Sequence, residues 1–432
     1  MKEKFKYRNL INIKNFFILF FLFYFFLNFS IFSYAFPPER TKREADKEFG
    51  WMFAPLPGCV EGVGCAVPIA GLISNFYKST DIVMLKTLVK GDIEATVVQL
   101  QKFPIVEEKL LLKVLHYDWD ISFRNYDRGI NSGKKDFYQT FENLNSSTIN
   151  IQSQFYNQQL EIQIGFSKGE TNISKIFDAE ENQFSNIQNP TRSWVDHSIG
   201  TQIDLTDNHL EPREGIRFEM LQNSTDYGLD ELSDYNVTSL NFTTYIPFFG
   251  SDTLLINAFE SRSSILESGL TDENALSNKF SLNCNLEKEL KACRDTEKKR
   301  INYWLARNRL GKSSALGGIN RMRAYSLGRF YAGNSSNYSL EYRFNFSEKQ
   351  TPINWIIMGG IRTVLQVAFF YELGGVSDDF TKLHNKMKTS FGVGFRTIMS
   401  GLIYRFDIAK GEDGIAPTLF INYPFSLGTL GS

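Results

Sequence analysis

Apolar and polar side chains alternate along many segments of the chain, and the clearest case is 340–346. Successive side chains of an extended strand point to opposite faces, so this segment would have one apolar face and one polar face. The apolar face carries Leu340, Tyr342, Phe344 and Phe346, and the polar face carries Glu341, Arg343 and Asn345. The same period of two occurs in 117–124, 160–166, 235–248, 365–373, 391–397, 402–409 and 419–425. These segments are predicted to be strands that contact water on one side only.

The number of strands follows from the length over which this pattern extends. Residues 57–425 would hold about sixteen strands, at about 23 residues for each strand and its connection. An even number places both ends of the chain on the same side of a membrane. After residue 35 no apolar run reaches about 18 residues, which excludes a helical membrane protein. We therefore predict an all-β fold, a transmembrane antiparallel β-barrel of about 16 strands that occupies residues 57–432.

The overall composition is compatible with this fold. The mean hydropathy is −0.24 and aromatic residues make up 15% of the chain. A transmembrane barrel has a polar lumen, which lowers the mean hydropathy, and aromatic belts at the two membrane interfaces. A large secreted all-β domain would have a similar composition, so composition alone leaves both classes open.

Residues 1–35 are predicted to be a signal peptide for Sec export. Five basic residues precede an apolar run over 16–32, and Ser33, Tyr34 and Ala35 follow it as a cleavage site. An uncleaved inner-membrane anchor is the alternative, because the run is close to the length of a spanning helix. Cleavage would leave a mature chain that begins at Phe36, with residues 36–56 as a short periplasmic leader.

Removal of the signal peptide also changes the net charge. Five of the 47 basic residues and one of the 48 acidic residues lie in 1–35, which leaves 42 basic and 47 acidic residues, or a net charge near −5. Such a chain has no basic excess for binding nucleic acid.

The four cysteines of an exported chain predict disulfide bonds. Cys284 and Cys293 enclose a strongly charged segment, which favours a loop tip closed by a local bridge. Cys59 and Cys65 form a second close pair near the start of the barrel. The spacing does not match a zinc site and no histidine lies nearby, so we expect no metal and no other cofactor.

A Gly-rich loop with several arginines precedes the strand at 340–346. Its segment 322–325 contains Arg323, Ala324 and Tyr325. This segment resembles the loop-6 signature of the BamA/TamA outer-membrane insertase superfamily, also called the bacterial surface antigen family. In that family a Val-Arg-Gly-Phe/Tyr element precedes a strand with an acidic residue. Ala324 stands where the family has glycine, so the loop must use an ordinary backbone conformation there or be strained.

Four further segments resemble motifs of the same family. Residues 204–220 are similar to a strand in the middle of the family barrel, and 368–375, 390–396 and 402–411 are similar to its last motifs in order and spacing. Residues 36–56 are too short for the periplasmic POTRA domains that precede the barrel in BamA and TamA. The resemblance therefore implies a barrel-only form.

The resemblance also implies that loop 6 folds back into the lumen. We expect Arg323 to pair there with Glu341 and Glu372, because both acids lie on the polar faces of their strands. Other members of this charge network and its loop would be Tyr325, Arg396, Arg405 and Asp407. The alternative is that these charges are simply solvated in a water-filled pore.

No catalytic site is expected from the four histidines, His116, His197, His209 and His384. His209 lies in a polar segment that favours a solvated turn. Ser198 follows His197 directly, and neighbours in a strand point to opposite faces, so the two cannot form a catalytic dyad. The protein is therefore predicted not to be an enzyme.

The function predicted from these features is assistance in the insertion or translocation of proteins or other molecules at the bacterial outer membrane. Its partners would be outer-membrane lipids and unfolded outer-membrane proteins, and the barrel would be a monomer. The first and last strands would pair weakly, because Pro68, Pro417 and Pro424 each lack a backbone donor. The alternatives are a passive pore or structural surface protein and, as a third class, a lipid-modifying barrel enzyme.

Overall fold

The structure is a computed structural model, and it describes residues 37–38, 49–77, 80–89, 93–188, 190–209, 211–286, 289–399, 402–421 and 427. The predicted signal peptide and the expected start at Phe36 lie outside these residues, as does Pro424. The described residues contain no helix that is long and apolar enough to cross a membrane.

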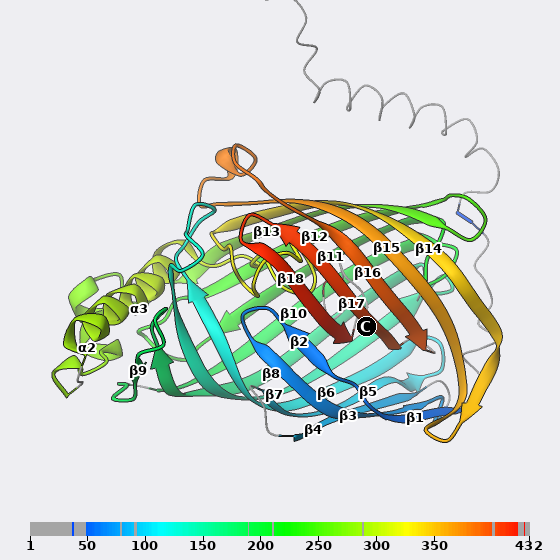
Figure 1. Ribbon diagram of the computed structural model, residues 1–432, viewed down its shortest axis with the longest axis horizontal. Helices are drawn as coiled ribbons and strands as arrows, with labels where there is room; N and C mark the ends of the chain where they lie inside the picture. The colour runs from blue at the N-terminus through cyan, green and yellow to red at the C-terminus, as the bar shows by residue number, and fades with distance from the viewer. Residues whose placement is uncertain are drawn as a thin grey trace, which may run out of the picture.

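One antiparallel sheet closes on itself into a barrel of 16 strands (Figure 1). The sheet has 18 segments, because β1 (Gly50–Pro55) and β2 (Gly58–Val60) both pair with β3 (Gly64–Ser74) as two halves of one strand. The short β9 (Gln183–Phe184) only extends the end of β8. The predicted barrel fold and strand number are therefore confirmed.

The other strands follow one another around the barrel in chain order, and their registers are antiparallel throughout. They are β4 (Asp81–Val89), β5 (Glu94–Val106), β6 (Leu110–Tyr126), β7 (Phe137–Phe155), β8 (Leu160–Phe177), β10 (Thr191–Thr206), β11 (Gly215–Asp226), β12 (Asp234–Pro247), β13 (Thr253–Glu267), β14 (Asn334–Trp355), β15 (Met358–Ser377), β16 (Lys388–Met399), β17 (Leu402–Gly411) and β18 (Gly414–Ile421).

Two expected boundaries differ from the structure. The barrel was expected to begin at residue 57, yet β1 already pairs with β3 and with β15. Residues 50–55 carry no polar side chain, so this half of the strand shows no alternation of apolar and polar positions. Pro68 was expected in the first strand, whereas it lies in β3 at a register shift next to Val67.

The two ends of the barrel differ in their connections. Tight turns join β7 to β8 and β14 to β15 at the end where β1 begins, which we call the short-turn end. The opposite long-loop end carries loop 6, the connection 268–333 between β13 and β14. Loop 6 contains the helices α2 (Glu273–Phe280) and α3 (Leu290–Leu310) and the short 3-10 helix η2 (Cys284–Leu286), and a further 3-10 helix, η3 (Phe380–Lys382), joins β15 to β16.

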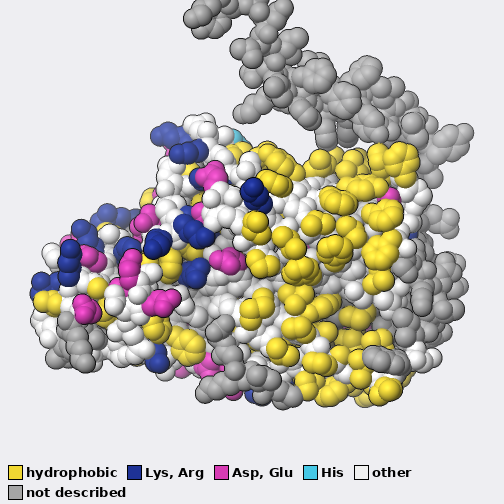
Figure 2. All heavy atoms as spheres, viewed as in Figure 1, with side chains coloured by type: hydrophobic (Ala, Val, Ile, Leu, Met, Phe, Trp, Pro, Cys, Tyr) yellow, Lys and Arg dark blue, Asp and Glu magenta, His cyan; other side chains and the backbone are white. Residues whose placement is uncertain are grey.

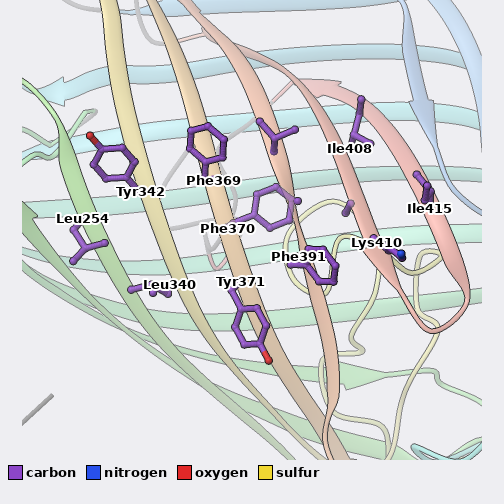
Figure 3. A pocket seen from close by; sticks show the side chains of 13 residues that line it. Leu254, Leu340, Tyr342, Phe369, Phe370, Tyr371, Phe391, Ile408, Lys410 and Ile415 are labelled. Atoms are coloured by element: carbon purple, nitrogen blue, oxygen red, sulfur yellow. The ribbon is translucent and has the colours of Figure 1, made fainter. Parts of the chain in front are cut away.

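The outer face of the barrel is apolar over much of its height. In Figure 2 hydrophobic side chains gather over the strands, and charged side chains gather at the end that carries α2 and α3. A groove of about 560 Å³ lies on this face. Figure 3 shows how Phe369 and Tyr371 of β15 lie beside Phe391 of β16 along it. Such an apolar surface on strands with polar inner faces is typical of a barrel that contacts lipid.

Near the long-loop end, β6 has its apolar side chains on the inner face and its polar side chains on the outer face. Phe123 faces a cavity beneath α3, and Ile121 is buried, whereas Asp118 is exposed and accepts a hydrogen bond from Asn143 across the outer face. The apolar face of 117–123 therefore packs inward under loop 6. Period two predicted the strand correctly, but it cannot indicate which face is covered by another part of the chain.

The helices of loop 6 pack on the barrel at the long-loop end. Ile301, Tyr303 and Trp304 of α3 lie in one buried cluster with Tyr138 of β7 and Ile173 of β8. Asp272 caps α2 by accepting a hydrogen bond from the Ala275 amide at 2.8 Å. Cys284 and Cys293 were expected to close a loop tip, but both are buried in this cluster.

Candidate functional site

The inner arm of loop 6, residues 312–333, lies inside the barrel against β13, β15 and β17. Met322, Ala324 and Tyr325 belong to a buried cluster with Phe259 of β13 and Phe370 of β15. Ala324 has an ordinary backbone conformation, and Met322 instead has a positive φ of 56°. The substitution of the family glycine is thus accommodated at a neighbouring position, with a small strain at Met322.

Glycines in the barrel wall make room for the inner arm. A Cβ atom at Gly374 would lie 2.7 Å from the Met322 side chain, and one at Gly411 would lie 2.8 Å from the Tyr325 ring. The Tyr325 hydroxyl donates to the Thr389 carbonyl at 2.9 Å. The wall and the loop therefore fit closely at these two points, which fixes the depth to which the loop descends.

Arg323, at the tip of the inner arm, contacts acids on three strands. Its Nε lies 3.0 Å from Glu372 Oε1, its Nη2 lies 3.1 Å from Glu341 Oε2, and its Nη1 lies 3.3 Å from Asp407 Oδ2. The Arg323 backbone amide also donates to Glu372 at 2.8 Å. The planar guanidinium thus bridges β14, β15 and β17, which an ammonium group could not do with the same geometry.

Glu341 is the most heavily paired acid of this site. Its two carboxylate oxygens accept from Arg396 at 2.8 Å each, and Arg343 donates to it at 2.8 Å. We call the seven charged side chains the Arg323 network: Arg323, Glu341, Arg343, Glu372, Arg396, Arg405 and Asp407. None of these side chains is more than 4% exposed. Four arginines thus surround three acids in a space from which bulk water is excluded.

Arg405 is not solvated, contrary to the alternative considered for the lumenal charges. Its Nη1 donates to Asp407 at 2.6 Å, and its Nη2 donates to the Ile319 carbonyl of the inner arm. Arg405 therefore holds the loop from the β17 side, much as Glu372 holds it from the β15 side.

The sequence placed Glu341, Glu372, Arg396, Arg405 and Asp407 on inward strand faces, and Arg323 and Tyr325 in a loop expected to enter the lumen. The structure brings Arg323 and the five strand residues into one network, whereas Tyr325 packs in the apolar cluster of the inner arm. It adds Arg343 as a third arginine of Glu341 and Asp407 as a third acid of Arg323. The alternation in 340–346 already put Arg343 on the face of Glu341. The contact with Asp407 had no sequence signal, because it depends on the stagger between strands.

Further arginines hold the loops of the long-loop end together. Arg128 donates to Asp378 through Nε and Nη2 and to the Gly311 carbonyl. Arg329 donates to Asp413 at 2.7 Å and to Ser132 at 2.8 Å. The sequence carries no signal for these contacts, because they join loops far apart in the chain.

Both expected cysteine pairs are joined in the structure. Cys284 and Cys293 have Cα atoms 5.6 Å apart, and Cys59 and Cys65 have Cα atoms 4.1 Å apart. The first bridge ties η2 to the start of α3, and the second closes the hairpin between β2 and β3.

His209 was expected in a solvated turn, which is wrong. Its side chain is only 13% exposed, and its Nδ1 lies 2.9 Å from Asp204. Burial lowers the pKa of His209 below its usual value, although the charge of Glu161 opposes this shift. The cluster is completed by Arg217, which donates to Asp204 at 3.0 Å and to the His209 carbonyl.

The other histidines form no complete catalytic site among the described residues. His197 is exposed on the outer face and meets the Phe166 ring edge to face, away from Ser198. His116 Nδ1 lies 3.0 Å from Ser147 Oγ on the outer face, but no described carboxylate orients this histidine. In the part of the chain that the structure describes, no group of three or more His, Cys, Asp or Glu side chains could hold a metal ion.

No family model and no curated protein matches the sequence. Among solved structures, BamA from Haemophilus ducreyi lacking POTRA domains 1-3 is 11% identical with a TM-score of 0.46, over 87% of this chain and 69% of that chain.

Two CdiB structures are similar to a comparable degree. CdiB from Escherichia coli is 8% identical with a TM-score of 0.49, over 86% of this chain and 62% of that chain. CdiB from Acinetobacter baumannii is 9% identical with a TM-score of 0.45, over 87% of this chain and 60% of that chain. This chain thus spans 60% to 69% of the length of these proteins.

Proposed function

We propose that the protein is a non-enzymatic barrel of the bacterial outer membrane that assists the insertion or translocation of other proteins there. Its apolar outer face would contact lipid, and its weak seam would open sideways to receive a strand of a client protein. On this proposal the short-turn end faces the periplasm and the long-loop end faces the exterior.

The observation that carries the proposal is the pairing at the seam. Among the described residues, β18 and β2 share one register pair, Leu419 with Cys59. By contrast, β17 and β18 share eight pairs, from Tyr404 with Ile421 to Gly411 with Gly414. Nearer the short-turn end, β1 pairs with β15 at two positions. Between the described residues, few hydrogen bonds must therefore break to expose the edge of β18.

The prolines contribute to this weakness in different ways. Pro417 lies in β18 opposite Ile408 of β17, and its nitrogen cannot donate a hydrogen bond toward either neighbour. Pro68 lies at the irregularity between β3 and β4, one strand away from the seam. Pro417 is therefore the proline that bears directly on opening.

A crosslink across the seam tests the proposal. In a background without the Cys59 and Cys65 pair, Val60→Cys and Thr418→Cys would join β2 to β18, one position from the pair Leu419 with Cys59. The matched control, Phe406→Cys with Leu419→Cys, joins β17 to β18, which remain paired in either state. Purified variants would be placed in liposomes, and the folding rate of a second outer-membrane barrel would be measured before and after reduction.

The expected result is faster client folding with the uncrosslinked barrel, loss of this acceleration in the oxidised seam variant, and its return on reduction. The control should accelerate folding in both states. Ion conductance without any acceleration would instead support the passive pore, and release of fatty acid from the liposomes would support a lipid-modifying enzyme.

A further inference from the structure

A second chamber lies near the long-loop end, between α3 and the inner face of β7, β8, β10, β11 and β12. Its volume is about 530 Å³, and no member of the Arg323 network lines it. We call it the α3 chamber. Its charged lining residues are five cations, Arg124, Arg192, Arg300, Arg307 and Lys312, and two acids, Glu142 and Asp196. Its aromatic lining residues are Phe123, Tyr126, Tyr138, Trp194, Tyr227, Tyr235, Tyr303, Trp304 and Tyr331.

Arg192 of β10 is the side chain that most needs an explanation. It is 8% exposed and lies over the ring of Trp304 at 4.7 Å. Among the described residues, its guanidinium makes no hydrogen bond and no ion pair. A buried arginine without an anionic partner is costly, because its charge has lost most of its hydration.

A second arginine lies close to Arg192. Arg300 of α3 donates to the Phe280 carbonyl at 2.6 Å and forms no ion pair with a described acid. Burial lowers the pKa of Arg300 to about 10, and the charge of Arg192 adds to this shift. The two guanidinium groups thus raise the local positive potential together.

Of the remaining cations, Arg307 and Lys312 are bonded to tyrosines, whereas Arg124 lies 3.7 Å from Glu61, outside the chamber lining. Arg307 donates to the hydroxyls of Tyr227 and Tyr235, and Lys312 donates to Tyr303 at 3.1 Å. Burial alone would raise the pKa of Tyr303, but Lys312 and Arg307 lower it to about 8. This shift indicates a strongly positive environment on the α3 side of the chamber.

The two acids do not neutralise these cations. Glu142 accepts hydrogen bonds from Thr140 and from Thr171, the latter at 2.7 Å, and Asp196 accepts one from Thr225 at 2.6 Å. Because Arg124 is already paired with Glu61, the other four cations against two acids leave the wall with two excess positive charges. An anion inside the chamber would therefore recover interactions that the wall itself does not supply.

The chamber is also shaped for a ring. A Cβ atom at Gly169 would lie 2.2 Å from the Trp194 ring, so the glycine allows this ring to lie flat against β8. A neighbouring cavity of about 410 Å³ shares Asp196, Tyr235, Arg307 and Lys312 with the chamber, and it extends the space toward the lumen. Aromatic walls with a few convergent polar groups are typical of sites for small ligands.

We infer that the α3 chamber binds a small organic anion, a molecule with a carboxylate or phosphate group attached to a ring, and that Arg192 is its principal ligand. The planar fork of Arg192 would take two oxygens of the anion, and the aromatic wall would cover the ring. This site is independent of the seam and of the insertion activity proposed above.

The test is a binding titration with the purified full-length barrel in detergent. The probes are benzoate for a carboxylate, phenyl phosphate for a phosphate, and benzyl alcohol as a neutral ring of similar size. The emission of Trp194 and Trp304 would report binding, together with the shift of the thermal midpoint. The variants are Arg192→Gln and Arg192→Lys, with Arg294→Gln as the control, because Arg294 lies exposed on α3 outside the chamber.

We expect saturable binding of at least one anionic probe and none of benzyl alcohol. Arg192→Gln should weaken that binding at least about tenfold, and Arg192→Lys should weaken it less, because it keeps the charge and loses the fork. Arg294→Gln should bind as the natural chain does. The inference is overturned if neither anion binds, if benzyl alcohol binds equally well, or if Arg192→Gln retains full affinity while it migrates as a folded barrel on a cold gel.

Discussion

Arg323 shows how one side chain can determine the position of a long loop. Its guanidinium contacts Glu341, Glu372 and Asp407, and it lies 3.4 Å from the centre of the Phe370 ring. A buried charge network contributes little net stability compared with an apolar core of the same shape, but removing one partner leaves the others uncompensated. The network therefore specifies one position of the inner arm more than it stabilises the barrel.

Substitution of Arg323 should accordingly release the inner arm. Arg323→Ala removes the ion pair of Glu372, which is its only one among the described residues, and should cost about 3 to 5 kcal/mol, as for a broken buried ion pair. We expect proteases to cleave loop 6 faster, and the midpoint of urea unfolding to fall. Arg323→Lys should have an intermediate effect, because one ammonium group cannot reach three strands.

The control for this substitution is Arg294→Ala, an exposed arginine of α3. It removes the same charge without breaking a buried pair. The free energy of unfolding should therefore change by less than about 0.5 kcal/mol. Equal protease resistance in Arg323→Ala and in this control would contradict the role given to Arg323.

His209 gives a second prediction at the scale of a residue, on the pH dependence of the turn 207–214. Burial lowers its pKa in the folded state, so below about pH 6.5 the unfolded turn binds more protons than the folded one. The stability of the turn should therefore be complete above this pH and fall as the pH decreases. The nearby charges are Asp204, Glu161 and Arg217.

Hydrogen exchange of the turn at pH 7.5 and 5.5, corrected for intrinsic rates, would measure this effect. His209→Asn can still donate to Asp204 but does not titrate, so its exchange should differ less between the two pH values. The turn 156–159 contains Tyr156 but no group that titrates in this range, and it provides an internal reference.

At the scale of elements, the sequence predicted the strands well and the helices not at all. Alternation with a period of two is a local property, so the predicted ends of β12 and β16 lie within a few residues of the observed ends. The observed β14 is much longer than the predicted segment 340–346. In α3 the buried positions recur at helical spacing, but they include Thr296, Arg300 and Asn308. These polar side chains hide the apolar stripe, because their partners come from other loops.

The disulfide between Cys284 and Cys293 should stabilise this helical unit. Its two sulfur-bearing residues are buried in the cluster that contains Ile301 and Trp304. Replacing both with serine removes a constraint worth about 2 to 3 kcal/mol in the loop-entropy model. We expect faster proteolysis of 273–310 in limited digestion, while the strands of the barrel remain protected.

The matched comparison is the pair Cys59 and Cys65 in the hairpin between β2 and β3. Its replacement by serine should leave the digestion of α2 and α3 unchanged, because it lies in another part of the barrel. If the two double variants give the same digestion pattern, the local role of the first bridge is wrong.

At the scale of the whole molecule, the lumen is occupied from two sides. On the wall formed by β14 to β17, the Arg323 network fills the space below the inner arm. On the opposite wall, Gln163, Gln202 and Glu219 face inward and are no more than 3% exposed. The sequence indicated which residues face the lumen, but not whether water or protein covers them, since burial depends on where loop 6 comes to rest.

This arrangement predicts a barrel that conducts ions poorly in its closed state. In planar bilayers we expect the natural chain to show small and infrequent openings, because buried side chains line both walls at the level of the network. Arg323→Ala should produce larger and longer openings, since the freed inner arm can leave the lumen, whereas Arg294→Ala should conduct as the natural chain does.

Crosslinking the seam through Val60→Cys and Thr418→Cys should leave the current of Arg323→Ala unchanged, because ions pass along the barrel axis and not through its wall. Large steady currents from the natural chain would contradict the filled lumen and favour a passive pore. Loss of the Arg323→Ala current on crosslinking would show that the conducting path runs through the seam instead.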